Sequence, residues 1–210
     1  MHVRTRVKIC GITCVEDAKA AAALGVDALG LVFYAKSPRN IEIDQAQLIC
    51  QALPGFVTTV ALFLNPEPDL VNQVISQVNI DCLQFHGTEP VDFCESFGKP
   101  YIKALGIAGA DNIDGVMAQY SSARSMLLDS HGAGKAGGTG ETFDWAEIPD
   151  ALRQKIILAG GLTPNNIADA IKQVRPYAVD LSSGVEMTPG KKDSKLMARL
   201  MSEVMRANCE

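Results

Sequence analysis

Two side chains that can exchange protons with a substrate stand at the ends of apolar, strand-like segments. Cys10 ends the segment VKIC at 7–10, and Asp129 ends the segment MLLD at 126–129. A thiol has a pKa of about 8.5, and cationic surroundings lower it, so a cysteine can act as a base or a nucleophile. A carboxylic acid in a partly apolar site has a raised pKa and can donate a proton. Facing each other across a pocket, Cys10 as general base and Asp129 as general acid would suit an isomerisation.

Both residues also have an ordinary structural explanation. A buried cysteine usually packs as a small apolar side chain. An aspartate that follows a strand often caps a loop. Taken singly, neither residue establishes catalysis.

Two glycine-rich segments late in the chain have the composition of a phosphate site. AGGLTP occupies 159–164 and SSGVE occupies 182–186, each at the end of an apolar segment. Backbone N–H groups at a helix start bind phosphate, and glycine lets the backbone approach the oxygen atoms closely. The alternative is that these glycines simply turn the chain. The residues expected to bind phosphate are Gly160, Gly161, Ser182, Ser183 and Gly184.

Arg39, His86 and Asp180 are candidate substrate-binding residues. Arg39 follows a Ser-Pro pair in a loop, and a guanidinium suits a bidentate contact with a carboxylate, although most loop arginines are simply solvated. His86 ends an apolar segment and would either bind substrate or satisfy a polar contact in the core. Asp180 lies within the last apolar segment, as Lys8 lies within the first. If those two segments are neighbours in a closed sheet, the two side chains would form an internal ion pair, whereas an open sheet would leave both unpaired at high cost.

Other motifs do not fit their usual ligands. The residues at 132–137 match GxGxxG, but the GTG that follows at 138–140 opens no helix, so a dinucleotide site is not expected. This stretch is more typical of a mobile loop that covers Asp129. His131, Cys10 and Cys14 lack the spacing of metal ligands. We therefore expect neither a metal nor a cofactor.

Eight short apolar segments must position these side chains. They lie at 7–10, 28–33, 57–64, 82–86, 101–105, 126–129, 156–159 and 178–181. Amphipathic segments separate them, and helix-start signals precede three of these at Thr13-x-x-Glu16, Asp44-x-x-Gln47 and Thr163-Pro164. This alternation predicts a parallel sheet covered on both faces. Eight such units favour a single (β/α)8 barrel domain over residues 1–210, with an active site at the C-terminal ends of its strands. A doubly wound open sheet is the alternative.

Composition narrows the class of protein. Of 210 residues, 47% are hydrophobic and 20% charged, which excludes intrinsic disorder. The net charge of −5 disfavours nucleic acid as a partner, and the apolar segments are too short to span a bilayer. No signal peptide is visible, and none of the six cysteines forms a CxxC motif, so a cytoplasmic location is expected.

The motifs together resemble the phosphoribosylanthranilate isomerase family nearly from end to end. They are KICGIT at 8–13, GLVF at 30–33, SPR at 37–39, LQFHG at 83–87, LD at 128–129, GGTGETFDW at 137–145, GGL at 160–162, NN at 165–166, VDLSSGVE at 179–186 and GKKD at 190–193. The resemblance implies a (β/α)8 barrel that is a monomer or a homodimer. It implies a cofactor-free Amadori rearrangement of N-(5-phosphoribosyl)anthranilate to 1-(2-carboxyphenylamino)-1-deoxyribulose 5-phosphate in tryptophan biosynthesis. It also implies Cys10 as base, Asp129 as acid, Arg39 at the anthranilate carboxylate, and phosphate at the last two loops.

Three alternatives remain at this point. One is another phosphosugar barrel, such as indole-glycerol-phosphate synthase or the histidine-pathway aldose isomerase. The latter resembles this reaction but uses paired aspartates, one of them where this chain has Cys10. The second is a barrel that binds a phosphate ligand without catalysis, and the third is a thiol redox sensor built on Cys10 and Cys14.

Overall fold

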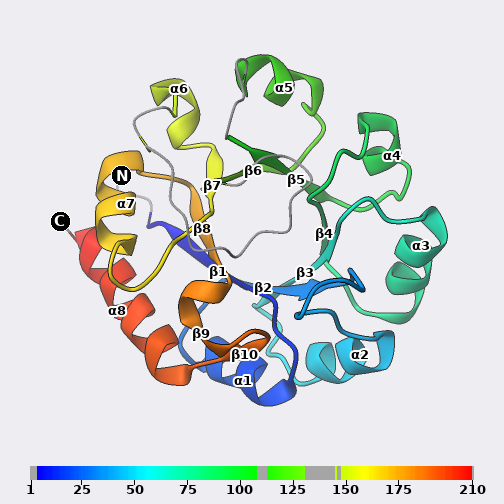
Figure 1. Ribbon diagram of the computed structural model, residues 1–210, viewed down its shortest axis with the longest axis horizontal. Helices are drawn as coiled ribbons and strands as arrows, with labels where there is room; N and C mark the ends of the chain where they lie inside the picture. The colour runs from blue at the N-terminus through cyan, green and yellow to red at the C-terminus, as the bar shows by residue number, and fades with distance from the viewer. Residues whose placement is uncertain (1–3, 108–112, 131–144, 146–147, 210) are drawn as a thin grey trace.

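Eight parallel strands close into a barrel that a ring of helices surrounds (Figure 1). The computed structural model describes residues 4–107, 113–130, 145 and 148–209. The barrel strands are β1 (Arg6–Cys10), β2 (Ala28–Val32), β3 (Thr58–Phe63), β4 (Cys82–Phe85), β5 (Tyr101–Gly106), β6 (Ser125–Asp129), β7 (Ile156–Leu158) and β8 (Ala178–Leu181). The helices are α1 (Val15–Ala23), α2 (Ile43–Gln51), α3 (Pro68–Gln77), α4 (Val91–Glu95), α5 (Ile113–Gln119), α6 (Asp150–Arg153), α7 (Ile167–Val174) and α8 (Ser194–Cys209).

Pairing of the first strand with the last closes the sheet. β1 lies between β2 and β8, and its residue Lys8 is in register with Ala28 on one side and Asp180 on the other. The predicted (β/α)8 barrel is therefore confirmed, and the open doubly wound sheet is excluded. Both described ends of the chain lie on the side of α7 and α8 (Figure 1).

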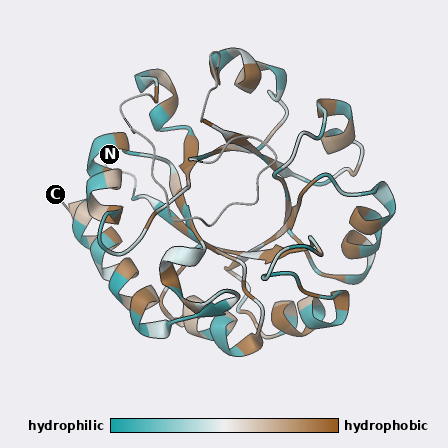
Figure 2. Cartoon of the chain, viewed as in Figure 1, coloured by the Kyte–Doolittle hydropathy of each residue, from teal (hydrophilic) through white to brown (hydrophobic). Residues whose placement is uncertain are grey.

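Alternation along the strands separates two apolar layers. One layer fills the space between strands and helices, and Val7 and Ile9 of β1 belong to it. The other lies inside the barrel and includes Val60, Leu127 and Ile157. The helices accordingly turn apolar faces to the sheet and polar faces outward (Figure 2). This period of two places Lys8 and Cys10 of β1 inside the barrel.

All three predicted helix starts are wrong, by one to three residues. Helix α1 follows Cys14, which makes no side-chain cap, so Thr13 lies just outside it. The Thr13 hydroxyl instead donates to the carbonyl of Gly190, 2.5 Å away. Helix α2 follows Glu42, so Asp44 lies within its first turn. For Thr13, a long-range contact has thus replaced the predicted cap.

The start predicted at Thr163-Pro164 lies three residues too early, because helix α7 follows Asn166.

A small hairpin follows the last barrel strand. A 3-10 turn, η2 (Ser183–Val185), leads into β9 (Glu186–Thr188) and the antiparallel β10 (Lys191–Lys192). The backbone N–H of Lys192 donates to the Asp17 carboxylate at 2.8 Å, which ties the hairpin to α1. The hairpin therefore holds Glu186 and Lys192 close to the end of β8.

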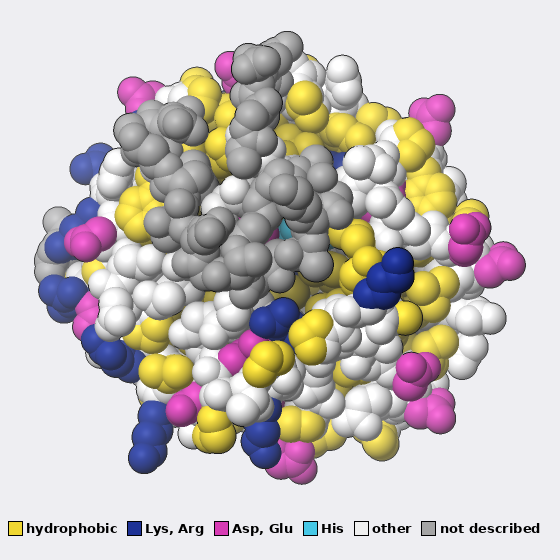
Figure 3. Space-filling model, viewed as in Figure 1, with side chains coloured by type: hydrophobic (Ala, Val, Ile, Leu, Met, Phe, Trp, Pro, Cys, Tyr) yellow, Lys and Arg dark blue, Asp and Glu magenta, His cyan; other side chains and the backbone are white. Residues whose placement is uncertain are grey.

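The outer surface carries charges of both signs. Acidic and basic side chains are interspersed around the rim of the face seen in Figure 3. Among the described helices, none combines the length and the apolar character needed to cross a membrane.

Candidate active site

All the site residues predicted from the sequence line one pocket at the C-terminal ends of the strands. They are Cys10, Arg39, His86, Asp129, Gly160, Gly161, Asp180, Ser182, Ser183 and Gly184. The pocket holds about 790 Å³ of empty space, including its open mouth.

Cys10 is buried at the end of β1, beside two ammonium groups. Its side chain has space because the neighbour on β2 is Gly30, where a Cβ atom would lie 2.7 Å from the Cys10 Sγ and 3.1 Å from the Lys8 Nζ. Burial raises the pKa of the Cys10 thiol, and the nearby Asp180 adds to this rise, whereas Lys8 and Lys192 oppose it. The thiol is therefore neutral near pH 7, with positive charge already in place to stabilise its anion.

Lys8 and Asp180 form the internal ion pair expected of a closed sheet. The Lys8 Nζ lies 2.9 Å from the Asp180 Oδ1, and the two side chains are 4% and 8% exposed. Burial disfavours the charged ammonium, but Asp180 and Cys10 outweigh this effect and raise the pKa of Lys8. Asp180 thus has a structural partner and also lines the pocket.

His86 lies between the side-chain amide of Gln84 and Asp129, the candidate general acid. Its Nε2 lies 3.5 Å from the Asp129 Oδ2, and its Nδ1 lies 3.2 Å from the Gln84 Nε2. The Gln84 amide thus contacts one ring nitrogen of His86 and the Asp129 carboxylate faces the other. The Ser130 hydroxyl also lies 3.4 Å from the Asp129 Oδ1. Asp129 is therefore held by neighbours at the end of β6.

Arg39 is held at the pocket by a carboxylate that the sequence analysis did not assign. Its Nε and Nη2 donate to the two oxygens of Glu186 at 2.8 and 2.7 Å. Lys192 Nζ donates to the same carboxylate at 2.8 Å and to the Ser182 carbonyl at 3.1 Å. Burial of Glu186 is outweighed by these two cations, which lower the pKa of its carboxyl. The cluster carries one net positive charge.

The pairing uses only one edge of the Arg39 guanidinium. Glu186 occupies the Nε and Nη2 edge, and none of the described residues receives a hydrogen bond from Nη1. Glu186 and Lys192 both stood in motifs that carried the family resemblance, but no local spacing connects either residue with Arg39, which lies 147 residues before Glu186.

The loops after β7 and β8 approach each other closely. Gly160 and Gly161 have φ angles of +88° and +61°, in the left-handed region that favours glycine. A Cβ atom on Gly184 would collide with the carbonyl oxygen of Leu162. Asn166 stabilises the first loop by accepting from the Thr163 N–H at 2.8 Å and donating to the Gly161 carbonyl at 3.0 Å. Glycine at these positions is thus required for two backbones to line one end of the pocket.

Comparison with known proteins agrees with this geometry. The family model described as N-(5'phosphoribosyl)anthranilate (PRA) isomerase matches residues 7–203. The chain belongs to the N-(5'-phosphoribosyl)anthranilate isomerase family. It is 53% identical over 203 residues to the N-(5'-phosphoribosyl)anthranilate isomerase of Pseudomonas fluorescens strain SBW25, covering 97% of each chain.

Solved structures of the N-(5'-phosphoribosyl)anthranilate isomerase family share the fold. The Thermotoga maritima phosphoribosyl anthranilate isomerase has a TM-score of 0.87 and 40% identity, covering 96% of this chain and 99% of that chain. A phosphoribosyl anthranilate isomerase in complex with reduced 1-(o-carboxyphenylamino)-1-deoxyribulose 5-phosphate has a TM-score of 0.82 and 39% identity, with the same coverage.

Predictions from the sequence also concern a loop at 132–137 and metal binding. The GxGxxG segment at 132–137 and the expected loop over Asp129 lie outside the described residues. Within the described ranges, His, Cys, Asp and Glu side chains form no group of three that could hold a metal ion.

Proposed function

We propose that this chain isomerises N-(5'-phosphoribosyl)anthranilate to 1-(2-carboxyphenylamino)-1-deoxyribulose 5-phosphate in tryptophan biosynthesis, with Cys10 as general base and Asp129 as general acid. Membership of the isomerase family supports the reaction. The observation that supports the two roles is that β1 and β6 end in these residues at a single pocket. The reaction needs one acid and one base but no change of oxidation state overall, so these two side chains suffice.

The first step opens the ribose ring. Protonated Asp129 donates to the ring oxygen while the nitrogen lone pair forms a C=N bond with C1. The C1–O bond breaks, and the product is an iminium ion conjugated with the anthranilate ring. His86, at 3.5 Å from Asp129, orients the carboxyl group for this transfer.

The second step moves a proton away from C2. Cys10 reacts from its thiolate form, after its thiol has released a proton to solvent. The thiolate takes the C2 proton, the C–H electron pair forms a C1–C2 double bond, and the iminium nitrogen becomes neutral. The resulting enolamine then tautomerises to the ketone. Exchange with solvent returns a proton to Asp129 and removes one from Cys10. Positive charge on Lys8 and Lys192 and on the iminium itself favours the thiolate that this step requires.

Two ends of the pocket hold the two ends of the substrate. The Nη1 end of Arg39, which donates to none of the described residues, binds the anthranilate carboxylate, since Glu186 already fixes the other edge of the guanidinium. Apolar lining from Val32 and Leu62 contacts the aromatic ring. The loops around Gly160 and Gly184 bind the phosphate through their backbone N–H groups. The reacting carbons are thereby placed between Cys10 and Asp129.

We further propose that residues 1–210 act as one domain, as a cytoplasmic monomer or homodimer. All six cysteines are free thiols, which suits a reducing compartment.

A fluorescence assay tests this function. The substrate is generated in situ from anthranilate and phosphoribosyl pyrophosphate with the corresponding transferase, in EDTA, and loss of its fluorescence is followed. Decay with the wild type, but only the spontaneous background with Cys10→Ala/Asp129→Asn, is expected. Background decay alone with folded wild-type protein would contradict the proposal and leave a phosphate-binding barrel, which titration with inorganic phosphate would detect.

A further inference from the structure

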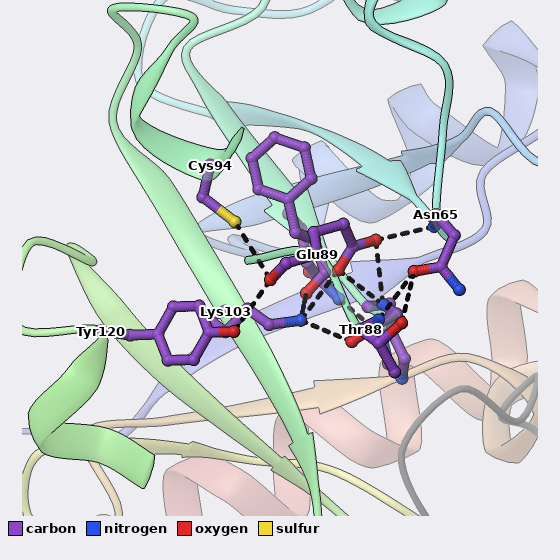
Figure 4. Close-up of polar contacts among 10 residues, drawn as sticks. Asn65, Thr88, Glu89, Cys94, Lys103 and Tyr120 are labelled. Carbon is purple, nitrogen blue, oxygen red and sulfur yellow. Dashed lines mark hydrogen bonds and ion pairs between the residues drawn. The ribbon is translucent and has the colours of Figure 1, made fainter. Parts of the chain in front are cut away.

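Figure 4 shows a buried ion pair whose two residues do not line the pocket. Lys103 on β5 and Glu89 on the loop after β4 are each 2% exposed along their side chains, and the Lys103 Nζ lies 2.9 Å from the Glu89 Oε2. Lys103 stands between Ile102 and Ala104, which belong to the layer inside the barrel, so its own side chain points outward. The proposed chemistry uses neither charge directly.

Lys103 fixes the backbone on both sides of His86. Its ammonium donates to the Phe85 carbonyl at 3.2 Å and to the Gly87 carbonyl at 2.6 Å, besides the Glu89 carboxylate. An ammonium has three N–H donors, and these contacts use all of them. The two peptide units that flank His86 are thus attached to a single buried atom.

Glu89 joins the same segment to the loop after β3. Its carboxylate accepts from the Gly87 N–H at 2.9 Å and from the Asn65 N–H at 2.7 Å. The Asn65 side chain in turn accepts from the Thr88 N–H at 2.7 Å. Gly87 has to be glycine here, because a Cβ atom would lie 2.8 Å from the Glu89 Oε1. Figure 4 shows this network around the labelled residues Asn65, Thr88, Glu89 and Lys103.

We propose that Lys103 and Glu89 are positioning residues that hold the His86 ring against Asp129. The inference rests on the proposed role of Asp129 as general acid. A buried ion pair is often no more stabilising than an apolar pair of similar volume, so stability alone does not account for it. The contacts instead restrict the one segment that carries His86, whose Nε2 faces the Asp129 carboxylate at 3.5 Å. A shift of about 1 Å at such a contact can lower turnover about 100-fold.

The test removes both charges together, because either charge alone would be left buried and unpaired. In Lys103→Met/Glu89→Gln, the glutamine oxygen can still accept from the Gly87 and Asn65 N–H groups. We expect kcat to fall about 10- to 100-fold while KM stays within about twofold, since Arg39 and the phosphate loops are untouched. Tyr120→Phe is the matched control, because it removes a 2.8 Å hydrogen bond to the Glu89 carbonyl and leaves the ion pair intact. Its kcat should equal that of the wild type.

A second readout does not depend on turnover. The chain has three histidines, so the ring nitrogens of His86 can be assigned by NMR with His2→Gln and His131→Gln variants. Asp129→Asn should shift the His86 ring signals in the wild-type background. We expect that shift to fall by at least half in the Lys103→Met/Glu89→Gln background, because the ring no longer faces residue 129.

The outcomes separate this proposal from the proposed function. If the wild type turns over substrate, any one of three results would overturn the positioning role. The double variant could keep the wild-type kcat, its His86 shift could be undiminished, or Tyr120→Phe could lose as much kcat as the double variant. A wild-type protein without turnover would overturn the proposed function itself, and the NMR comparison would still decide whether the ion pair orients His86.

Discussion

The thiol of Cys10 is buried among charges that act on it in opposite directions. Replacing it with alanine removes the proposed base but leaves a side chain of compatible size in a packed position. Cys10→Ala is therefore expected to lower kcat about 10²- to 10⁴-fold, the usual contribution of a proton transfer. The fluorescence assay measures kcat, and urea unfolding provides the control for folding. A variant with near-wild-type turnover would exclude Cys10 as the base.

The ionisation of this thiol can be followed without substrate. Burial raises the pKa of Cys10, so less thiolate is present at a given pH than for a free cysteine. The alkylation rate by iodoacetamide follows the thiolate fraction, and its half-maximum should lie above the ordinary value of about 8.5. Asp180 adds to this rise in pKa, so Asp180→Asn should move the half-maximum to lower pH. Peptide mass spectrometry separates Cys10 from Cys14. A half-maximum at or below the ordinary value would contradict this account.

Arg39 is expected to act on binding rather than on turnover. Its proposed ligand is a carboxylate that is present in the substrate and does not take part in bond changes. Arg39→Ala should therefore raise KM by about 10- to 100-fold, the value of a charge-assisted bidentate contact, and lower kcat much less. Inhibition by inorganic phosphate serves as the control, because it should not change. An unaltered KM would argue against the contact.

At the scale of elements, the loops after β7 and β8 can pack closely against each other because residue 184 is glycine. Gly184→Ala would drive a Cβ atom into the Leu162 carbonyl and force the two loops apart. The displaced loops should bind inorganic phosphate more weakly, so its inhibition constant should rise at least about tenfold. A tenfold rise corresponds to a loss of roughly 1.4 kcal/mol of binding free energy. Gly55→Ala is the control, since a Cβ atom there meets nothing within 4 Å. Equal phosphate inhibition in both variants would contradict the phosphate site.

Strands and helices differed in how well the sequence predicted them. Strand positions followed from short apolar segments, and their polar last residues pointed to the pocket because parallel strands end at one face. Helix starts were less accurate. Thr13 has the residue type of a cap, but its hydroxyl is bound to Gly190, which is 177 residues away. Glu186 was missed as the partner of Arg39 for the same reason: local patterns contain no information about contacts between distant segments.

At the scale of the whole molecule, Lys8 and Asp180 connect the first and last strands inside the barrel. The closed sheet could be anticipated from this pair, because an open sheet would have left both charges unpaired. Lys8→Met should lower the free energy of unfolding by about 3–5 kcal/mol, since it leaves Asp180 buried without its partner. Urea unfolding measures this change.

The Arg4–Asp27 pair provides the matched control for that measurement. Its arginine side chain is 56% exposed, so Arg4→Ala should cost at most about 1 kcal/mol. Similar losses in the two variants would mean that the Lys8–Asp180 pair is no more important than a surface contact.

The pairing of β1 with β8 also has a consequence for synthesis on the ribosome. Strand β1 is made first and finds β2 soon afterwards, but its other edge has no partner until Ala178–Leu181 has been translated. Until then the nascent chain carries an unpaired edge and an unneutralised Lys8, and such edges promote misassembly. Cys10 likewise has no pocket before Gly184 has been added. Strand β1 is thus translated first but gains its second neighbour last, and until then Cys10 and the loop after β8 cannot line one pocket.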